Sequence, residues 1–450
     1  MTHRLLAAVG AAAFFLIPVF TAVASGSKEA AGSGPVALQY AFWGDQNEIN
    51  ATNAYLQSYM AEHPNVKIEA LNFGSNTQFN TKITTLAASN SLPDLGYFYE
   101  PNVLTWGMDG RFVDLTDFYK NQPAKLDALK FVTPDGKIVG ISVANEIQVI
   151  WYNKKMFDSA GLPYPPSDPT KAWSWDQYVE VAKKLTKDVN GKTPNDAGFD
   201  PTNIKTFGTW VQNWFMPWIT FAISNGGGFV SDDGKRLLMD RPETIEAIQK
   251  MADLVGVDHV SPAPGTQQMP TAAATALLSQ QVAMVVDGTW DLLTIGITKE
   301  QQGLDFGVGV LPYMKKLADT SVGTPIVVYK SSKHIPEALQ LLKYVMSPVN
   351  SLPLLKSGLW LPNEKQWYSD PKLIAQWVDN PRHPPEYKSA VVDFALNYSH
   401  RLPEYYVPSF SKMDDVIEPA LQQVWLGQKS AQDVINNEIM PKITPIFKGM

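Results

Sequence analysis

The chain has 450 residues, a formal net charge of −7 and no Cys, and 45% of its residues are hydrophobic, including 13 Trp, 17 Tyr and 20 Phe. The negative charge argues against a nucleic-acid partner, because phosphates need a basic face, and the lack of Cys excludes disulfides, thiol nucleophiles, Cys-based metal sites and a lipid-anchored Cys. Since a single hydrophobic core stops growing at about 250 to 300 residues, the length predicts two domains.

The N-terminus, residues 1–24, is predicted to be a cleaved signal peptide. Arg4 supplies a positive charge, residues 5–20 are almost wholly apolar, and Ala22-Val23-Ala24 has the small-x-small pattern of a cleavage site. An uncleaved membrane anchor is the alternative, because the apolar stretch approaches the roughly 20 residues that span a bilayer. Residues 25–35 are rich in Ser, Gly and Ala and predict a flexible leader.

Beyond the leader, short strand-like runs alternate with amphipathic helical patterns. Capping boxes predict helices that begin after Ser174 and Asp240, because each has Gln or Glu three residues later. Buried strands are predicted at 38–43, 282–286 and 306–311. This alternation is typical of an α/β fold with parallel sheets.

Aromatic side chains recur beside carboxylates and amides directly after the predicted strands. In an open α/β sheet the ligand binds at the carboxyl ends of the strands, so these positions are candidates for a binding site. Trp covers the C–H faces of a sugar ring while carboxylates and amides bind its hydroxyl groups, and this combination suits a neutral sugar. The candidates are Trp43, Asp45, Tyr99, Glu100, Asn102, Asn145, Glu146, Asp287, Trp290 and Asp291.

Each candidate also has a purely structural interpretation. A single Trp is more often a core or rim residue than a platform for a ligand, although Trp43 and Trp290 each lie at a strand end close to Gly, which leaves room for a ligand. The three Trp in the range 210–218 are spaced four residues apart, which predicts one helical face that packs at least partly in the core. For Asp45 the alternative to binding is a helix N-cap.

Several segments occur in an order that is shared by one protein family. They are LQYAFWGD (38–45), LPDLGYFYEPN (92–102), VANEIQVIWYNKKMFDSAGLPYPP (143–166), WSWDQYVEVAKKLT (173–186), NWFMPWITFAISNGGGF (213–229), QVAMVVDGTW (281–290), FGVGVLPY (306–313) and KSGLWLPN (356–363). The ordered series YNK, AGLP, AM-x-x-DG-x-W and LP is the most specific part. In these segments the chain resembles the extracellular solute-binding proteins (family 1) of carbohydrate ABC importers, the family of the maltose-binding protein.

The resemblance implies a two-lobed periplasmic binding protein fold of the class II type, with the ligand cleft between the lobes. The lobes would close by a hinge motion on a sugar, expected to be a di- or oligosaccharide, and deliver it to a membrane permease driven by a separate ATPase. We expect a monomer with no cofactor and no metal, free in the periplasm, because the lipobox Cys of many relatives is absent. The expected lobes are 36–142 with 304–347, and 143–303 with 348–450, with crossings near Ser142, Leu304 and Ser347.

The resemblance also assigns ligand-binding residues, each at a position that matches a family motif or follows a predicted strand. The predicted ligand-binding residues are Trp43, Asp45, Tyr99, Glu100, Asn145, Glu146, Asn213, Trp214, Trp290, Gly323, Thr324 and Trp360. Gly323-Thr324 departs from the Gly-Gly pair of many relatives, which puts a backbone contact there in doubt. Ser142 stands where Pro is common, which weakens that hinge strand.

Two other functions remain open on the sequence alone. The same fold can bind a polyamine, a peptide or an iron chelate, and a polyamine site would need several carboxylates with few amides, whereas iron would need tyrosines such as Tyr405-Tyr406. A secreted glycoside hydrolase would need two carboxylates that flank the scissile bond. The sequence has no GxSxG or HExxH motif and its His residues are scattered, so we expect no enzyme. Asp232-Asp233-Gly234 predicts a turn and no calcium loop.

Overall fold

The computed structural model describes residues 34–448, except 124, 127–128, 267–268 and 270–271. The predicted signal peptide and all but the last two residues of the predicted leader lie outside the described residues. Within the described ranges, no helix combines the length and the apolar character that crossing a membrane requires.

The first sheet has six strands in the order β2-β1-β3-β12-β5-β4. β1 pairs in parallel with β2 and β3, whereas β12 is antiparallel to β3 and β5, and β4 is antiparallel to β5. In this sheet the strands are β1 (Val36–Phe42), β2 (Val66–Asn72), β3 (Leu95–Tyr97), β4 (Lys130–Val132), β5 (Ile138–Ser142) and β12 (Pro325–Val328).

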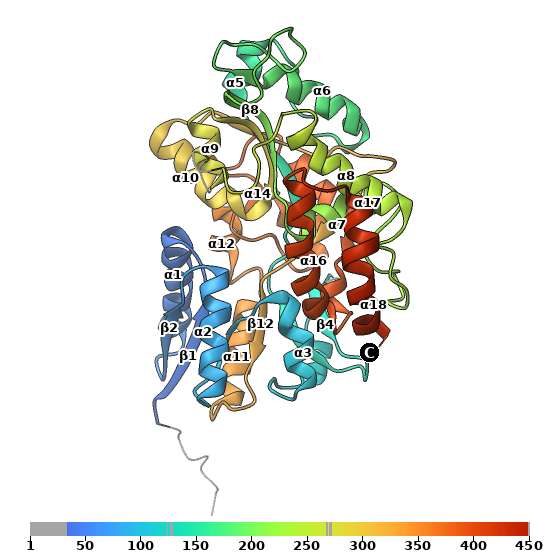
Figure 1. Cartoon of the computed structure of the whole chain (residues 1–450). Coiled ribbons are helices and arrows are strands. Elements are labelled where there is room, and N and C mark those ends of the chain that lie inside the picture. The colour runs from blue at the N-terminus through green and yellow to red at the C-terminus, as the bar shows by residue number, and fades with distance from the viewer. Residues whose placement is uncertain (1–33, 124, 127–128, 267–268, 270–271, 449–450) are drawn as a thin grey trace, which may run out of the picture. The chain divides into compact units, whose positions relative to one another are not determined.

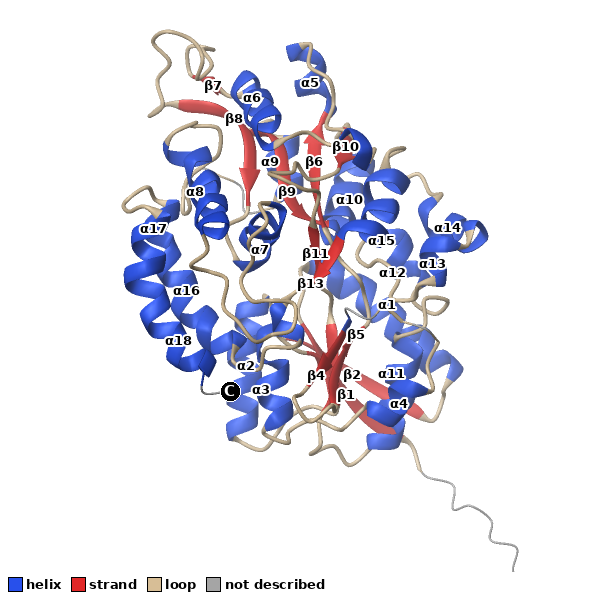
Figure 2. Cartoon of the chain, turned by 90° about the vertical axis from the view of Figure 1, so that its right-hand side faces the viewer, coloured by secondary structure: helices blue, strands red, loops and turns tan. Residues whose placement is uncertain are grey.

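The second sheet has five strands in the order β10-β6-β9-β8-β7, and a short parallel pair forms a third sheet (Figure 2). β8 and β9 are parallel, and the remaining neighbours in the second sheet are antiparallel. Its strands are β6 (Gln148–Asn153), β7 (Lys187–Asp188), β8 (Ile204–Val211), β9 (Val282–Gly288) and β10 (Phe306–Gly309). The short pair is β11 (Asp319–Ser321) with β13 (Ser399–Arg401).

The expected α/β fold is confirmed, but the prediction of parallel sheets holds only for some strand pairs, because both sheets are mixed. β4 and β5 are joined by a tight turn in which the Gly136 amide donates to the Thr133 carbonyl. A connection this short only permits an antiparallel pair, since a parallel pair needs a crossover of a dozen residues or more. β12 enters the first sheet from the opposite direction because the chain arrives there from the second sheet.

Helices cover both sheets, and the last of them, α16, α17 and α18, pack against one another (Figure 1). The helices up to the middle of the chain are α1 (Gln46–Glu62), α2 (Asn76–Ala88), α3 (Val103–Met108), α4 (Thr116–Lys120), α5 (Lys154–Ala160), α6 (Trp175–Leu185), α7 (Phe215–Ser224) and α8 (Pro242–Gly256). The later helices are α9 (Ala273–Leu278), α10 (Leu292–Gln302), α11 (Ile335–Val345), α12 (Leu352–Ser357), α13 (Gln366–Ser369), α14 (Pro371–Val378), α15 (Phe394–Tyr398), α16 (Phe410–Trp425), α17 (Ala431–Val434) and α18 (Met440–Lys448).

Single-turn segments extend several of these helices. The 3₁₀ turns are η1 (Glu100–Asn102), η3 (Pro169–Lys171), η4 (Thr289–Asp291) and η6 (Pro403–Tyr405). Two π-helical turns are η5 (Lys388–Asp393) and η7 (Ile435–Ile439). η1 and η4 directly follow β3 and β9, so the chain turns sharply at both strand ends.

One of the two predicted capping boxes is confirmed. At α6 the Ser174 side chain accepts from the Gln177 amide and the Gln177 side chain accepts from the Ser174 amide. The second is wrong, because α8 begins one residue later than predicted: Arg241 is its N-cap, and no side chain caps the helix. Pro242 at the first position explains the shift, since its fixed φ suits that position and it needs no hydrogen-bond acceptor.

The expectation that the three Trp in the range 210–218 share one helical face is wrong. β8 ends at Val211, so Trp210 belongs to a strand, and Trp214 is the extended N-cap of α7. Only Trp218 lies inside the helix, where it is fully buried, in agreement with the expected packing role. The spacing of four residues does not indicate a helical face here, because it spans the boundary between a strand and a helix.

Two segments that connect the two sheets lie side by side, and backbone hydrogen bonds join them to each other and to residues 361–363. Residues 143–147 join β5 to β6, and residues 310–324 join β10 to β12. The Glu146 amide donates to the Val322 carbonyl at 2.8 Å, and the Asn145 amide donates to the Leu361 carbonyl at 3.1 Å. We call residues 143–147, 321–324 and 361–363 the crossing segments.

β10 belongs to the second sheet, where it pairs with β6. The crossing that we expected near Leu304 therefore lies further along the chain, between Gly309 and Pro325. The physical reason is local: α10 ends at Gly303, and the Lys154 amide then donates to the Asp305 carbonyl at 3.0 Å, which aligns the chain with β6.

Candidate ligand-binding site

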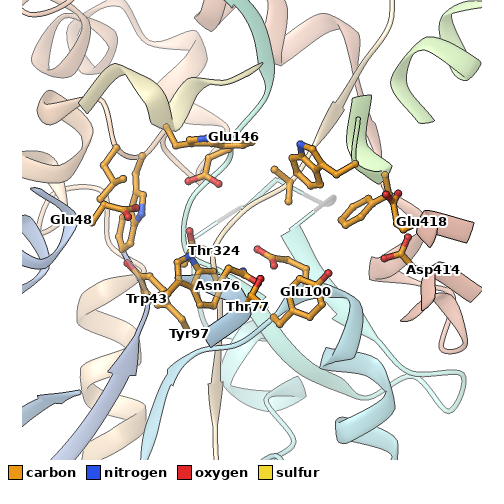
Figure 3. Close-up of a pocket in the computed structure, with 17 residues that line it drawn as sticks. Trp43, Glu48, Asn76, Thr77, Tyr97, Glu100, Glu146, Thr324, Asp414 and Glu418 are labelled. Atoms are coloured by element: carbon orange, nitrogen blue, oxygen red, sulfur yellow. The ribbon is translucent and has the colours of Figure 1, made fainter. Parts of the chain in front are cut away.

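A cavity of about 570 Å³ lies where strand ends of the two sheets and the crossing segments meet (Figure 3). A volume of this size is typical of small-molecule sites. We call it the central cavity. Its lining residues are Trp43, Glu48, Asn76, Thr77, Tyr97, Tyr99, Glu100, Glu146, Trp214, Phe215, Trp290, Val322, Thr324, Leu359, Trp360, Asp414 and Glu418.

The first sheet presents its residues through the ends of three neighbouring strands. Because β1 and β3 are parallel, Trp43 and Tyr99 follow them at the same edge of the sheet. β12 runs the opposite way, so its start, with Thr324 directly before it, lies at that edge too. The Trp43 ring packs edge-on against Tyr97, with ring centroids 5.0 Å apart and an angle of 73° between the rings.

The second sheet contributes two Trp residues from its parallel pair of strands. Trp214 follows β8 and Trp290 follows β9, and their ring centroids are 6.2 Å apart at an angle of 52°. Gly288 lies directly beneath the Trp290 ring, since a Cβ atom at this position would approach three ring carbons to 2.2 Å. The glycine therefore determines where the Trp290 ring sits.

A substitution at Gly288 tests this arrangement. Gly288→Ala has to displace the Trp290 ring, because no two atoms can approach so closely. We expect ligand affinity to fall about tenfold, the magnitude of one aromatic contact. Isothermal titration calorimetry checks this, and unchanged affinity would show that the ring position does not matter for binding.

The C-terminal helix α16 closes the cavity with two carboxyl groups, Asp414 and Glu418. They are four residues apart and therefore project from the same helical face. Glu418 accepts a hydrogen bond from the Trp218 indole nitrogen at 3.2 Å. These two residues add carboxyl groups to a wall that otherwise consists largely of aromatic rings (Figure 3).

The cavity lining contains five carboxyl groups and no Lys, Arg or His. Burial raises the pKa of Glu48 to about 7, that of Asp414 to about 8 and that of Glu418 to about 7. The pKa of Asp414 is raised further by the neighbouring carboxylates of Glu418 and Asp415.

Two further cavity carboxyl groups are almost fully enclosed. Burial raises the pKa of Glu146 well above its usual range, and the carboxylate of Glu100 raises it further, while a hydrogen bond from Thr324 partly offsets both. Burial likewise raises the pKa of Glu100. Behind Glu100 lies Glu404, which is 1% exposed and whose two carboxyl oxygens have no hydrogen-bond partner.

These pKa values predict how the stability of the ligand-free protein changes with pH. A carboxyl group whose pKa is higher in the folded state than in the unfolded state favours folding at low pH, and this contribution is lost as the pH rises through the folded-state value. For Asp414 the pKa rises from an ordinary 3.8 to about 8, and for Glu418 it rises from 4.5 to about 7. We expect the Tm to fall between about pH 5 and pH 8, and to fall less in Asp414→Asn. Thermal denaturation across this range checks it, and an equal fall in the variant contradicts it.

A family model matches most of the chain. Residues 39–351 match the model of the bacterial extracellular solute-binding proteins, which is well over half of the sequence. The chain belongs to this family. Its members are substrate-binding proteins rather than enzymes, and the described residues contain no group of three or more His, Asp or Glu placed to hold a metal ion.

Several solute-binding proteins, some of them solved with a bound sugar, are similar to this chain. The multiple sugar-binding protein of Streptococcus mutans is 22% identical over 358 residues, which covers 76% of this chain and 77% of that protein. An ABC substrate-binding protein from Listeria monocytogenes, solved with cycloalternan, aligns with a TM-score of 0.76 and 21% identity over 91% of this chain and 99% of that chain. A maltose-bound MalE3 of T. maritima aligns with a TM-score of 0.71 and 19% identity over 92% of this chain and 99% of that chain. These structures confirm the two-lobed fold of the periplasmic sugar-binding proteins.

In this solute-binding protein most of the predicted site residues do lie together. The residues that line the central cavity as predicted are Trp43, Tyr99, Glu100, Glu146, Trp214, Trp290, Thr324 and Trp360. Trp360 is only 2% exposed, so it forms part of the inner wall rather than the mouth. Their roles in ligand binding remain predictions.

Four predicted residues are placed outside the cavity lining. Asp45 caps α1, where its side chain accepts from the amides of Asn47 and Glu48 at 2.8 and 3.0 Å. Asn145 is buried in the crossing segments and donates to the Tyr368 hydroxyl at 3.0 Å. Asn213 lines a separate cavity of about 40 Å³. Gly323 packs so closely that a Cβ atom there would lie 2.3 Å from the Ala144 carbonyl oxygen.

Sequence reasoning missed the cavity residues that lie on helices. Those residues include Glu48 on α1, Asn76 and Thr77 at the start of α2, and Asp414 and Glu418 on α16. In α16 one signal was available, since Asp414 and Glu418 each directly follow a core residue, Met413 and Ile417. They therefore flank the buried stripe and do not lie on the opposite, solvated face.

Proposed function

We propose that this protein is the substrate-binding component of an ABC importer and that it binds a sugar in the central cavity. The observation that carries the proposal is the cavity wall itself, which combines four Trp residues with five carboxyl groups from strand ends, helices and a crossing segment. The named ligands of the similar proteins, cycloalternan and maltose, support a di- or oligosaccharide as the ligand.

The chemistry of the wall supports this ligand class. Trp43 on one side and the pair Trp214 and Trp290 on the other offer flat apolar faces for sugar rings. A hydrogen bond to a charged group contributes about 1.5 to 3 kcal/mol, and ring stacking adds on the order of 1 kcal/mol beyond the buried area. A few such contacts account for micromolar affinity, which corresponds to about 8 kcal/mol. The absence of basic residues from the lining disfavours a phosphorylated or otherwise anionic solute.

In this proposal the lobes close on the sugar by bending at the crossing segments. One lobe is built on the first sheet and contains residues 36–142 with the later strand β12 and helix α11; the other is built on the second sheet. Glu146 lies in a crossing segment and lines the cavity at the same time. Ligand contact at Glu146 would therefore act directly on the segment that bends.

The remaining parts of the proposal follow from the family and the composition. The protein acts as a monomer in the periplasm, donates its sugar to the permease subunits of the importer, binds no nucleic acid and catalyses no reaction. A net charge of −7 supports the absence of a nucleic-acid partner.

A thermal-shift screen followed by calorimetry tests the proposed function. The purified protein is heated with neutral mono- and oligosaccharides, amino sugars, polyamines and short peptides. A ligand at 100 times its dissociation constant adds about 2.7 kcal/mol to the stability and raises the Tm clearly. We expect a shift with one sugar series and no hydrolysis of that sugar. A shift with peptides or polyamines alone contradicts the sugar assignment, and turnover of an oligosaccharide contradicts the binding-protein assignment.

A further inference from the structure

The ionisable side chains that line the central cavity are all acidic or phenolic, and none is basic. Five carboxyl groups face it together with a single amide, that of Asn76, and no cationic side chain. None of the ion pairs between described residues involves any of the five carboxyl groups. Among the described residues, therefore, no ion pair supplies a counter-charge to these groups.

Three of the five carboxyl groups, Glu100, Asp414 and Glu418, lie near Tyr99, whose pKa burial raises and their charges raise further, and we call this part of the cavity the acidic end. Figure 3 shows Asp414 and Glu418 on the side opposite Trp43 and Glu48, with Glu100 between them. Buried Glu404 stands behind this end, and Glu100 and Asp414 both raise its pKa. Tyr99 and Phe215 complete the wall there.

A neutral sugar does not explain this concentration of acid. A carboxylate binds a hydroxyl group more strongly than an amide side chain does, but the amide carries no charge and costs far less to bury. Burying several carboxylates side by side is unfavourable unless a positive charge joins them, and a charge-assisted hydrogen bond is then about twice as strong as a neutral one. Glu404, at 1% exposure and with both carboxyl oxygens unpartnered, adds a further buried acidic group behind this end.

We propose that the ligand is an amino sugar, a mono- or oligosaccharide with a protonated amine that binds at the acidic end. This inference rests on the proposed function and narrows its ligand class. The amine would lie between Glu100, Asp414 and Glu418, where Tyr99 and Phe215 add attraction between a cation and an aromatic ring. The sugar rings would lie along the Trp residues towards Trp43. A simple polyamine would bind the carboxyl groups but has no sugar rings to stack on the Trp side chains.

Matched ligands test the proposal directly. Three forms of each sugar are compared by calorimetry, with a free amine, an acetylated amine and a hydroxyl group at the same carbon, for monosaccharides and for their β-1,4-linked oligomers. We expect the free amine to bind about 10- to 100-fold more tightly than the other two forms, and this preference to shrink as salt is added. Equal or tighter binding of the neutral forms overturns the amino-sugar inference and leaves the proposed function intact. If polyamines bind and no sugar of any form does, the proposed function fails as well.

A double variant and a control variant test where the amine of the ligand binds. The double variant Asp414→Asn, Glu418→Gln keeps the hydrogen-bonding capacity and the acceptor for Trp218 while it removes two charges from the acidic end. We expect it to lose the preference for the free amine. Asp240→Asn is the control, since Asp240 is exposed and does not line the cavity, and the substitution removes the same kind of charge. A preference that survives in the double variant, or disappears equally in the control, overturns the assignment to the acidic end.

Proton release supplies a third readout. The titratable groups that face the acidic end and one another are Tyr99, Glu100, Glu146, Glu404, Tyr405, Asp414, Asp415 and Glu418, and all of them are acids. A bound cation favours their charged forms, so binding an amine near pH 7 has to release protons, whereas binding a neutral sugar does not. Calorimetry in two buffers with different ionisation enthalpies measures this release, and no release on binding an amine contradicts the proposal.

Discussion

Trp290→Ala is expected to reduce sugar affinity by about 100-fold or more while the fold is retained. The substitution removes a flat face of the central cavity, and with it the support for Trp214, whose ring centroid lies 6.2 Å away. The loss of ring stacking and of buried apolar area together accounts for about 3 kcal/mol, which is about two decades in affinity. Calorimetric titration with the best ligand of the screen measures the loss.

Trp106→Ala is the matched control for this variant. Trp106 is also partly buried, and it packs on Phe98, Phe112 and the guanidinium of Arg111. It does not line the central cavity, so its removal is expected to lower stability without changing affinity. Circular dichroism shows whether each variant is folded. If Trp290→Ala is folded and binds as tightly as the parent, its ring is not a sugar platform.

The cavity residues that local sequence reasoning identified are those that directly follow strands. Trp43, Tyr99 and Trp290 were identifiable because a strand, its end and the next residues are encoded within a few positions, and parallel neighbours bring their ends to one edge. Asp45 shows the limit of the same argument. Its position after β1 suits both a ligand contact and a helix cap; the hydrogen bonds to the Asn47 and Glu48 amides show the cap, while the ligand contact stays a prediction.

The contribution of α16 was not predictable because it depends on contacts between distant parts of the chain. Asp414 and Glu418 look like ordinary polar residues of an amphipathic helix, and nothing near them in the sequence shows that α16 packs against η1 and η6. The sheet to which β10 belongs was not predictable for the same reason. Its own residues predict a strand correctly, but the partner that it pairs with, β6, lies about 150 residues earlier and is chosen by tertiary contacts.

The buried polar network near the crossing segments was not predictable either, because it joins residues that lie far apart in the sequence. Lys125 and Glu364 are almost 240 residues apart, yet the Lys125 ammonium lies 2.7 Å from a Glu364 carboxylate oxygen, with side chains that are 2% and 5% exposed. The same ammonium donates to the Met346 carbonyl at 2.9 Å and to the Asn363 side chain at 3.2 Å. Asn363 in turn donates to the Val143 carbonyl at 3.0 Å. Asn363 therefore links two of the crossing segments, and Lys125 holds Asn363 in place.

Glu364→Ala is accordingly expected to lower the free energy of unfolding by about 3 to 5 kcal/mol, because it leaves the buried Lys125 ammonium without a counter-charge. Burial already lowers the pKa of Lys125, and the hydrogen bond and charge of Glu364 oppose that effect. Without Glu364 the Lys pKa falls further, so the deficit has to shrink as the pH is raised and the amine loses its proton. Equilibrium unfolding in urea at neutral and alkaline pH measures both effects.

Two further variants separate the loss of this ion pair from the simple loss of a side chain. Asp117→Ala removes an ion pair between side chains that are 67% and 95% exposed, and it is expected to change stability little. The double variant Lys125→Met, Glu364→Leu removes both buried charges and should recover much of the stability that Glu364→Ala loses, because it leaves no unpaired ion inside the protein. If Glu364→Ala costs no more than Asp117→Ala, or the double variant is as unstable as the single one, the buried charge is not what makes Glu364 important. A recovery would show that the unpaired Lys125 ammonium, and not the lost Glu364 side chain, destabilises Glu364→Ala at a contact that lies outside the central cavity.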